Sequence, residues 1–438
     1  MSKKFDMEFF LDDINSQESL TCIDEVIYRW NGNNWSVLKD RQGEALALAW
    51  LRENAPDAMS KATAQSAWGT LKLDLLTKLP TLPAKQTLIP CQGTYVIVKE
   101  DGELVTLPPS KDMFCTYSLA CSYDPSAVAP RFAEFLEQTL ADETLRARVQ
   151  EFVGYTLLPD HRYQRAAMWL GTGANGKGVL SNIVQALHKE VAAIKVNNHS
   201  RFAMSGVLNA SLLVDDELPF DGLDEARLKS MIAGEPIFID IKGHDPITTR
   251  VRGKLLTLGN NFPKIRDCSE GFWRRWEVIP FNTEVPESMR DPMLAETIIR
   301  KELTGVLNWA LEGLQRLLRR GGFEPNRPMA MAETLKEAKR VADDVTGWIS
   351  DRVMTMKGPL MTHKADVYAD YRRWCVDNDH APQSPQGFWL KLKGCRMDLA
   401  TKKIRVGSGT LNACSIVLRP HEDEFEAAAN GEFFVQAA

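Results

Sequence analysis

The 438-residue sequence predicts an α/β protein organised around a phosphate-binding P-loop. Three consecutive patterns support this: an apolar run at 166–170, a glycine-rich stretch at 171–178 and an apolar-periodic run at 179–187. They indicate a buried strand, a tight loop and a helix, which is the context that a P-loop requires. The candidate nucleotide-binding segment consists of Gly171, Thr172, Gly173, Ala174, Asn175, Gly176, Lys177, Gly178 and Val179.

The chemistry of this segment suits phosphate binding. Its glycines let backbone N–H groups point at phosphate oxygens, and the following helix adds the positive end of its dipole. Lys177 is expected to contact the β- and γ-phosphates as a point charge. Gly178 stands where P-loops usually carry the serine or threonine that binds magnesium. Either water fills that coordination position or magnesium is bound weakly.

Composition sets limits on the whole chain. Its length predicts two to four domains, and 44% hydrophobic with 25% charged residues is typical of a soluble globular protein. No run of 18 apolar residues and no signal peptide is present, so we expect a cytoplasmic protein without a membrane partner. The eight cysteines form no C-x-x-C pair, which favours reduced, buried thiols. Because the net charge is −5, any nucleic-acid-binding surface must be local.

Residues 1–125 are expected to form a small N-terminal α+β domain. Residues 26–37 alternate around an Asn-Gly-Asn turn and predict a hairpin, helical patterns follow near 43–53 and 60–78, and a second β region covers 95–107. The paired-aspartate pattern of a primase is missing. We therefore expect a structural or DNA-contacting accessory domain.

Residues 126–165 have apolar side chains at three- and four-residue spacings, and Pro159 ends the pattern. This predicts a helical collar directly before the ATPase core. A plain packing bundle is equally compatible with the spacing.

Two further strands within the predicted core, residues 166–344, end in polar residues. The apolar run from 211 ends in acidic residues, which a P-loop enzyme needs to hold Mg²⁺ and orient the attacking water. Asp216 and Glu217 are the best candidates, with Asp215 as an alternative. The run from 254 ends at Asn260, whose amide could hydrogen-bond the γ-phosphate or its water.

Two basic pairs complete the candidate set. Residues 237–247 predict two short strands joined by a turn that carries Lys242 and His244, although an ordinary exposed hairpin has the same pattern. Arg274 and Arg275 precede a strand, and arginine can stabilise transition-state phosphate charge from a neighbouring subunit. Each feature alone has an ordinary structural explanation.

The order of these features resembles the superfamily 3 helicases, and more narrowly the primase–helicases of phages, plasmids and poxviruses. The segments that carry the resemblance are 171–177, 216–217, 229–234, 260–263 and 273–281, within a similar stretch of roughly 90–320. The resemblance implies an AAA+-like P-loop ATPase core that assembles as a ring, usually a hexamer, and pulls single-stranded DNA through its pore. The implied cofactors are ATP and Mg²⁺.

The resemblance also implies roles for single residues. Lys177 would bind phosphates, Asp216 and Glu217 would hold the metal and water, and Asn260 would sense the γ-phosphate.

For the basic pairs, Arg275 would be the finger that acts on a neighbouring subunit, with Arg274 as its rival. Lys242 and His244 match the pore hairpin that grips the DNA strand.

The last part of the chain changes pattern. Residues 345–420 predict two helices and then a β pair formed by 404–406 and 415–418, which is typical of a C-terminal winged-helix domain. Residues 351–420 hold 12 Lys/Arg against 6 Asp/Glu, which favours DNA contact over a solvated basic face. The acidic tail, 421–438, is expected to be disordered, and its tip could bind a partner.

The sequence therefore predicts an ATP-dependent DNA helicase that translocates on single-stranded DNA as a ring, in the replication of a phage, plasmid or other mobile element. The alternative is an ATP-controlled DNA-binding replication initiator or loader without processive unwinding. A P-loop kinase is a further rival, but no acceptor-binding feature supports it. The expected partners are DNA, in the pore and as origin duplex at the winged helix, other copies of the chain, and a separately encoded primase.

Overall fold

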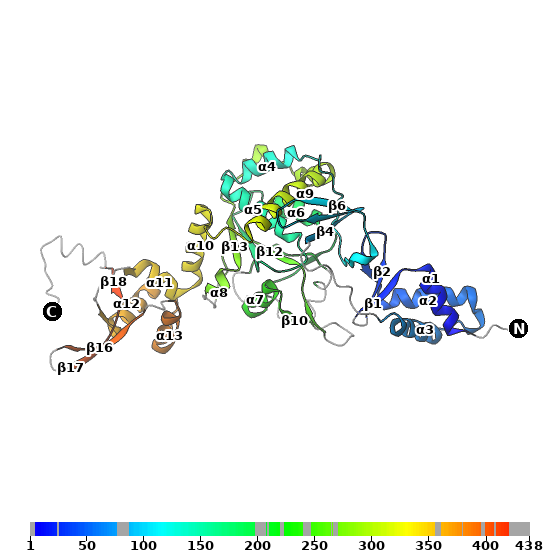
Figure 1. Cartoon of the computed structure of the whole chain (residues 1–438). Helices are drawn as coiled ribbons and strands as arrows, with labels where there is room; N and C mark the ends of the chain where they lie inside the picture. Colours follow the sequence, from blue (N-terminus) through cyan, green and yellow to red (C-terminus); the bar gives the residue numbers. More distant parts are fainter. Residues whose placement is uncertain are drawn as a thin grey trace.

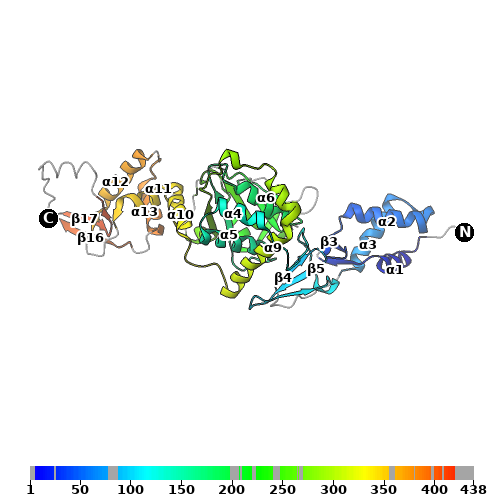
Figure 2. The ribbon, with the colours of Figure 1, turned by 90° about the horizontal axis from the view of Figure 1, so that it is seen from above.

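The computed structural model describes most of the chain, and Figure 1 shows a central α/β body between two smaller terminal units. The described residues are 5–23, 26–76, 87–197, 207, 210–219, 223–239, 247–263, 265, 270–354, 361–378, 380–395, 399–406 and 409–419. Figure 2 shows the N-terminal and C-terminal units on opposite sides of this central body. Among the described helices, none combines the length and apolar character needed to cross a membrane.

A five-stranded parallel sheet forms the centre of the molecule, in the order β13-β7-β12-β9-β8. Its strands are β7 (Ala166–Leu170), β8 (Val191–Ala193), β9 (Leu212–Asp215), β12 (Lys254–Gly259) and β13 (Trp276–Pro280). Every residue of β7, β9, β12 and β13 is buried, as expected for a parallel sheet covered on both faces. The predicted α/β class is confirmed, and the carboxyl ends of these strands meet at one edge.

Different elements cover the two faces of the sheet. Trp169 of β7 packs into one buried cluster and Met168 into the other, because successive strand side chains point to opposite faces. The first face is covered by α4 (Pro130–Thr139), α5 (Glu143–Thr156), α6 (Lys177–Leu187) and α9 (Leu294–Arg320). The second is covered by α7 (Glu225–Ala233), α8 (Glu270–Trp273) and α10 (Met329–Ala342).

The helices of the predicted collar form part of this cover. Phe132 of α4 and Val149 of α5 belong to the same buried cluster as the strand Trp169, and α5 packs along α9. Arg148 of α5 makes a buried ion pair with Glu277 of β13, with a 2.9 Å distance between Nε and Oε2. These helices are therefore integral to the central body and do not form a separate layer, since their apolar side faces the sheet.

The boundary predicted at residue 125 differs from the structure. The antiparallel sheet β4 (Thr87–Cys91), β5 (Thr94–Val98) and β6 (Leu104–Leu107) lies within that predicted domain. Its buried residues Ile89 and Val96 nevertheless join the central cluster, and Arg319 of α9 donates to the Asp101 carbonyl at 2.8 Å. The apolar face of this sheet packs against the central helices, so the sheet belongs to the central body.

The N-terminal unit has a hydrophobic core of its own, with Phe10, Trp50 and Trp68 at its centre. Its elements are α1 (Met7–Gln17), β1 (Leu20–Ile23), β2 (Val26–Trp30), β3 (Trp35–Val37), η1 (Pro56–Ala58), α2 (Asp40–Asn54) and α3 (Lys61–Asp74). β2 and β3 pair antiparallel across the Asn31–Asn34 turn, so the predicted hairpin is present. Asp6 and Ser60 cap α1 and α3 with their side chains.

A further antiparallel hairpin projects from the central body and consists of β10 (Pro236–Ile239) and β11 (Ile247–Arg250). It lies on the opposite side of the body from α4 (Figure 1). Two strands are therefore present, but the second begins at Ile247, so it lies almost wholly beyond the predicted range 237–247. The turn that carries Lys242 and His244 lies outside the described residues.

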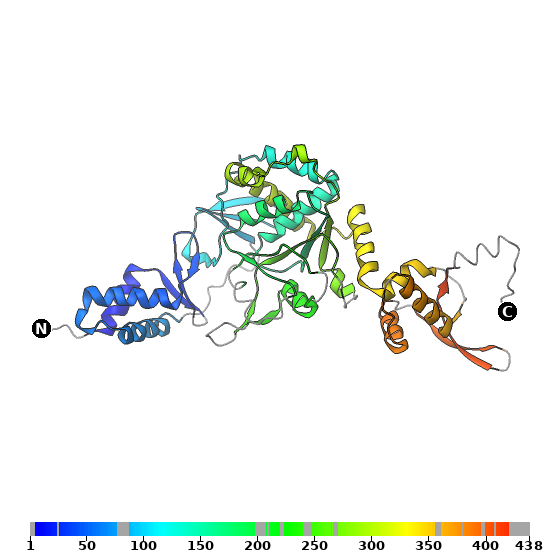
Figure 3. The same ribbon diagram turned by 180° about the vertical axis from the view of Figure 1, so that it is seen from behind.

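The C-terminal unit follows α10 (Figure 3) and packs around Trp348, Tyr371 and Phe388. Its elements are α11 (Asp344–Arg352), β14 (Val353–Met354), β15 (Thr362–His363), α12 (Lys364–Asp377), α13 (Pro385–Cys395), β16 (Thr401–Val406), β17 (Gly409–Cys414) and β18 (Val417–Leu418). Two predicted helices and a β ribbon are thus present, with α11 as an additional helix. The acidic tail lies outside the described residues.

The strand pairing predicted in this unit is wrong in one respect. β16 pairs with β17, not with residues 415–418, and β18 pairs with β14 instead. Residues 409–414 follow β16 closely and can form a hairpin ladder with it directly. The more apolar segment 415–418 consequently closes the unit against the end of α11.

Candidate active site

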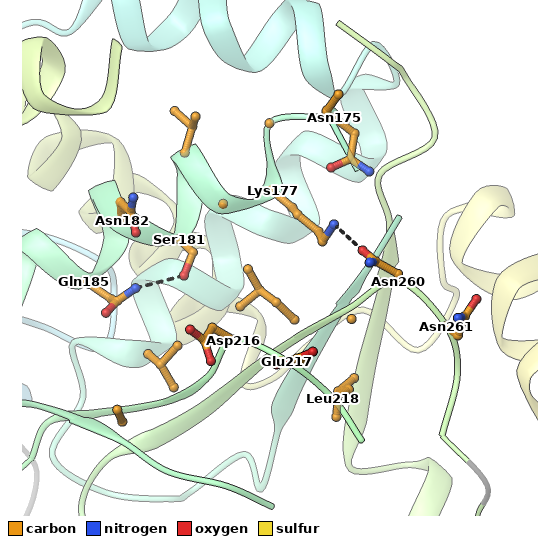
Figure 4. A pocket seen from close by; sticks show the side chains of 18 residues that line it. Asn175, Lys177, Ser181, Asn182, Gln185, Asp216, Glu217, Leu218, Asn260 and Asn261 are labelled. Atoms are coloured by element: carbon orange, nitrogen blue, oxygen red, sulfur yellow. Dashed lines mark hydrogen bonds between the residues drawn. The ribbon is translucent and has the colours of Figure 1, made fainter. Parts of the chain in front are cut away.

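A cleft of 770 Å³ lies at the carboxyl edge of the parallel sheet (Figure 4). It is bordered by the residues that follow β7, β9 and β12, which are neighbours in the sheet order. Its polar lining consists of Asn175, Lys177, Ser181, Asn182, Gln185, Asp216, Glu217, Asn260 and Asn261. Three segments that are remote in the sequence therefore meet here.

The loop between β7 and α6 has the conformation that its glycines favour. Gly176, which precedes α6, has a φ of +80°, in the left-handed region where glycine carries no steric cost. A Cβ atom on Gly171 would lie 2.0 Å from Nδ2 of Asn175 and 2.6 Å from the Phe281 carbonyl, so a side chain there would displace the loop. Asn175 is buried and donates to that carbonyl at 2.9 Å. Asn175 thus anchors the loop to the end of β13.

Lys177 lies at the first turn of α6 and reaches across the cleft (Figure 4). Its Nζ donates to the Gly171 carbonyl at 2.8 Å and to Oδ1 of Asn260 at 3.0 Å. Partial burial lowers the pKa of Lys177 below its ordinary value. Both acceptors are neutral, so a phosphate oxygen could compete with them for the ammonium group. The structure therefore brings together two candidates that lie 83 positions apart in the sequence.

Asp215 has a structural role at the end of β9. It is fully buried; its Oδ2 accepts from the Val196 amide at 2.8 Å and its Oδ1 from the Glu217 amide at 3.2 Å. Oδ1 also contacts Nζ of Lys195 at 3.1 Å. Because its oxygens are engaged by these groups, Asp215 fixes the turn that follows and does not line the cleft.

Asp216 and Glu217 lie on that turn, and both line the cleft. The Asp216 side chain is 82% exposed, and its Oδ1 lies 3.2 Å from Nζ of Lys195. Sequence reasoning missed Lys195, which follows the short edge strand β8 without any motif to mark it.

The oxygen donors of this edge suit a hard cation such as Mg²⁺. Mg²⁺ in nucleotide sites is typically held by one or two carboxylates together with substrate phosphates and water. Asp216 and Glu217 provide such a pair, whereas the described residues contain no cluster of three or more His, Cys, Asp and Glu side chains able to hold a metal.

Arg274 and Arg275 lie at the opposite edge of the sheet. They precede β13, and the Arg275 carbonyl accepts from the Ala166 amide at 2.8 Å, beside the start of β7. Five strand residues separate this point from the P-loop, about 17 Å at the usual rise per residue. Burial and the neighbouring Arg274 lower the pKa of Arg275, whose guanidinium donates to the Gly271 carbonyl. Within one chain, these arginines do not reach the cleft.

Comparison with known proteins gives two family matches and solved structures with a similar fold. A family model described as "D5 N terminal like" matches residues 8–141, and one described as "Family of unknown function (DUF5906)" matches residues 169–275. The apo structure of the NrS-1 C-terminal region is similar over 95% of this chain and 100% of its own, with 11% identity and a TM-score of 0.55. Its A-form apo structure covers the same shares with 11% identity and a TM-score of 0.53.

These two family matches support the resemblance to a phage-type superfamily 3 helicase-like protein. The DUF5906 match runs from β7 to the arginine pair and so spans every candidate of the active site. The D5 N-terminal match covers the N-terminal unit and continues through β4–β6 to α4, the first of the helices that cover the sheet. The family matches indicate a helicase-type function in replication.

Besides Asn261, sequence reasoning missed three polar residues of the cleft: Ser181, Asn182 and Gln185. They lie on α6 three, four and seven positions after Gly178, the spacings that place side chains on one helix face. The signal was a polar stripe within an otherwise apolar helix. The P-loop motif ends near Gly178, about one helical turn before Ser181, so the motif does not include these residues.

Proposed function

We propose that the chain is an ATP-dependent DNA helicase that uses Mg²⁺, assembles as a ring of about six copies and translocates on single-stranded DNA. Its role would be replication of a phage, plasmid or other mobile element. The observation that carries this proposal is the contact of Lys177 with Asn260 at 3.0 Å, in the cleft that Asp216 and Glu217 also line. A phosphate-binding cation, an amide sensor and two carboxylates are the groups that ATP hydrolysis requires.

The chain's own residues would divide the chemistry as follows. Lys177 would exchange its neutral acceptors for the β- and γ-phosphate oxygens. Asp216 and Glu217 would hold Mg²⁺, which when bound neutralises charge on the phosphate oxygens. Glu217 would orient the attacking water. The Asn260 amide has one end on Lys177, so the hydrogens at its other end can be donated to the γ-phosphate.

The position of the arginines supports catalysis between subunits. Arg274 and Arg275 lie about 17 Å from the P-loop of their own chain, beyond the reach of a side chain. In a head-to-tail ring, one edge of each subunit faces the opposite edge of the next. We propose that Arg275, with Arg274 as the alternative, completes the neighbour's cleft as an arginine finger.

Two basic regions are proposed to contact DNA. The turn with Lys242 and His244 would line the pore and hold backbone phosphates of one strand, a sequence-independent contact that weakens with salt. In the C-terminal unit, which we interpret as a winged helix, Lys402, Lys403 and Arg405 are exposed on the β16–β17 ribbon. This ribbon would contact duplex DNA at an origin.

Stimulation of ATP hydrolysis by single-stranded DNA tests the proposal. A translocating enzyme should hydrolyse ATP several-fold faster with single-stranded DNA and should unwind a forked duplex. An ATP-controlled initiator or loader should hydrolyse ATP at an unchanged rate and leave the fork intact. Lys242→Ala should keep basal hydrolysis within about twofold but lose the stimulation and the unwinding, because it removes only a DNA phosphate contact. Normal unwinding by this variant would show that the hairpin has no role in unwinding.

A further inference from the structure

Gly178 deprives the P-loop of its usual hydroxyl, yet the cleft contains another hydroxyl one helical turn later. Ser181 of α6 lines the same cleft as Gly178 and Asp216. Its side chain is buried, with a relative exposure of 2% for the residue. Figure 4 shows this side chain pointing from α6 towards the turn that carries Asp216. A cleft-facing hydroxyl is therefore present on the side of the site where the metal would bind.

Helix geometry places Ser181 on the same face as Gly178. Residues three apart on an α-helix are surface neighbours, with an axial rise of about 4.5 Å between them. This offset is too large for Ser181 to occupy the exact position of the missing hydroxyl. It is small enough to be spanned by one water molecule of a hydrated magnesium ion, which usually keeps several waters.

Gln185 sets the orientation of the Ser181 hydroxyl. Its Nε2 donates to Oγ of Ser181 at 3.1 Å, so the hydroxyl acts as acceptor in that bond. A hydroxyl has one hydrogen and two lone pairs, so its hydrogen and one lone pair remain for the cleft. Gln185 also lines the cleft and follows Ser181 by one turn.

We propose that Ser181 supplies the hydroxyl that P-loops otherwise carry at position 178. It binds a water ligand of the magnesium ion that Asp216, Glu217 and the nucleotide phosphates hold. Gln185 is the positioning residue for this hydroxyl. The inference rests on the proposed function, because it concerns the metal of the same nucleotide site. It explains how a P-loop with glycine at position 178 can retain magnesium-dependent chemistry.

The test compares three variants of the full chain: Ser181→Ala, Gly178→Ser and the double variant. The measurement is the affinity for a fluorescent ATP analogue, by anisotropy, across a magnesium titration and in EDTA. Ser181→Ala should raise the magnesium concentration at half-saturation about fivefold, the effect of losing one hydrogen bond. Its affinity in EDTA should stay within about twofold, because the hydroxyl acts only through the metal's water.

The double variant provides the decisive comparison. An added Cβ on Gly178 meets nothing within 4 Å, so a serine fits there without displacing the loop. Gly178→Ser should return the Ser181→Ala variant to within about twofold of the wild-type magnesium requirement, because the two hydroxyls serve one ion. Ser230→Ala, on α7 and outside the cleft lining, is the matched control and should leave the requirement unchanged.

The outcomes separate this inference from the proposed function. If the wild-type chain binds no ATP analogue at any magnesium concentration, the proposed function fails and the inference fails with it. If the wild type binds but Ser181→Ala weakens binding equally with magnesium and in EDTA, or leaves the magnesium requirement unchanged, the inference alone is overturned. Failure of Gly178→Ser to restore the requirement overturns it as well. Alanine favours helices, and thermal melting checks that α6 is intact in each variant.

Discussion

Lys177, the first residue of α6, and Lys254, the first residue of β12, differ in what their ammonium groups contact. Lys177 follows β7 and donates to one carbonyl and one amide at an open cleft. Lys254 begins β12, is fully buried, and donates to the carbonyls of Leu158 at 2.7 Å and Arg252 at 3.1 Å. Its ammonium also lies 5.1 Å from the centroid of the Tyr155 ring.

The difference shows what separates a candidate catalytic lysine from a structural one. Burial lowers the pKa of Lys254 to about 7, but its ammonium is bonded to carbonyls inside the core and does not line the cleft. A perturbed pKa alone would therefore direct attention to the wrong residue. The partners of Lys177 can be exchanged for a phosphate, and those of Lys254 cannot, because the surrounding core holds them.

The largest effect is expected for Lys177→Ala. ATP turnover should fall by at least about 100-fold, because the ammonium that balances the phosphate charge is lost. The melting temperature should stay close to that of the wild type, since Lys177 contacts the cleft and not the core. A steady-state ATPase assay together with calorimetry checks both expectations. Undiminished turnover would refute the nucleotide site.

Lys254→Met should change the stability of the fold, whereas Lys177→Ala should change ATP turnover. Because the folded pKa of about 7 lies below the unfolded value of 10.5, the unfolded chain binds more protons between these pH values. Wild-type stability should therefore rise with pH across this window relative to the methionine variant, by up to about 1.4 kcal/mol per pH unit. Urea unfolding of both proteins at pH 7.5, 8.5 and 9.5 measures this difference. A constant difference would mean that Lys254 stays protonated in the fold throughout.

The two edges of the sheet can be compared by mixing variants. Arg275→Ala and Lys177→Ala should each be inactive alone, but a mixture should recover part of the hydrolysis. Some interfaces then pair an intact P-loop with an intact finger from the other chain. Arg274→Ala in the same mixture shows which arginine is required. If no mixture exceeds its parents, the arginines do not act between subunits.

Much of the cleft could be anticipated from the sequence, because parallel strands carry their carboxyl ends to one edge. The strands before Lys177, Glu217 and Asn260 are apolar runs, and their loops had to meet once the sheet was parallel. The winged-helix interpretation, the roles of these side chains and the ring remain predictions.

Other features could not be predicted, since they depend on long-range packing. Nothing in residues 87–107 reveals that their apolar face contacts α5 and α9 instead of the N-terminal helices. Likewise, Asn175 looked like a phosphate ligand, but its amide is committed to the Phe281 carbonyl. The position of Lys195 beside Asp215 and Asp216 follows from the order β9-β8 at the sheet edge, which periodicity does not give.

The smallest effect is expected for a substitution of Gly178, which leaves the contacts of Lys177 and Lys254 unchanged. Gly178→Ser should lower the magnesium concentration needed for half-maximal hydrolysis, because it adds an oxygen ligand to a site otherwise built from Asp216, Glu217, phosphates and water. Steric exclusion is not expected to interfere, since an added Cβ meets nothing within 4 Å. If Ser181 already serves the ion, the gain in the otherwise wild-type chain should be modest, about twofold, and smaller than in the Ser181→Ala background. An equal gain in both backgrounds would mean that the two hydroxyls act independently, and a raised magnesium requirement would mean that the new hydroxyl competes with a ligand already in place.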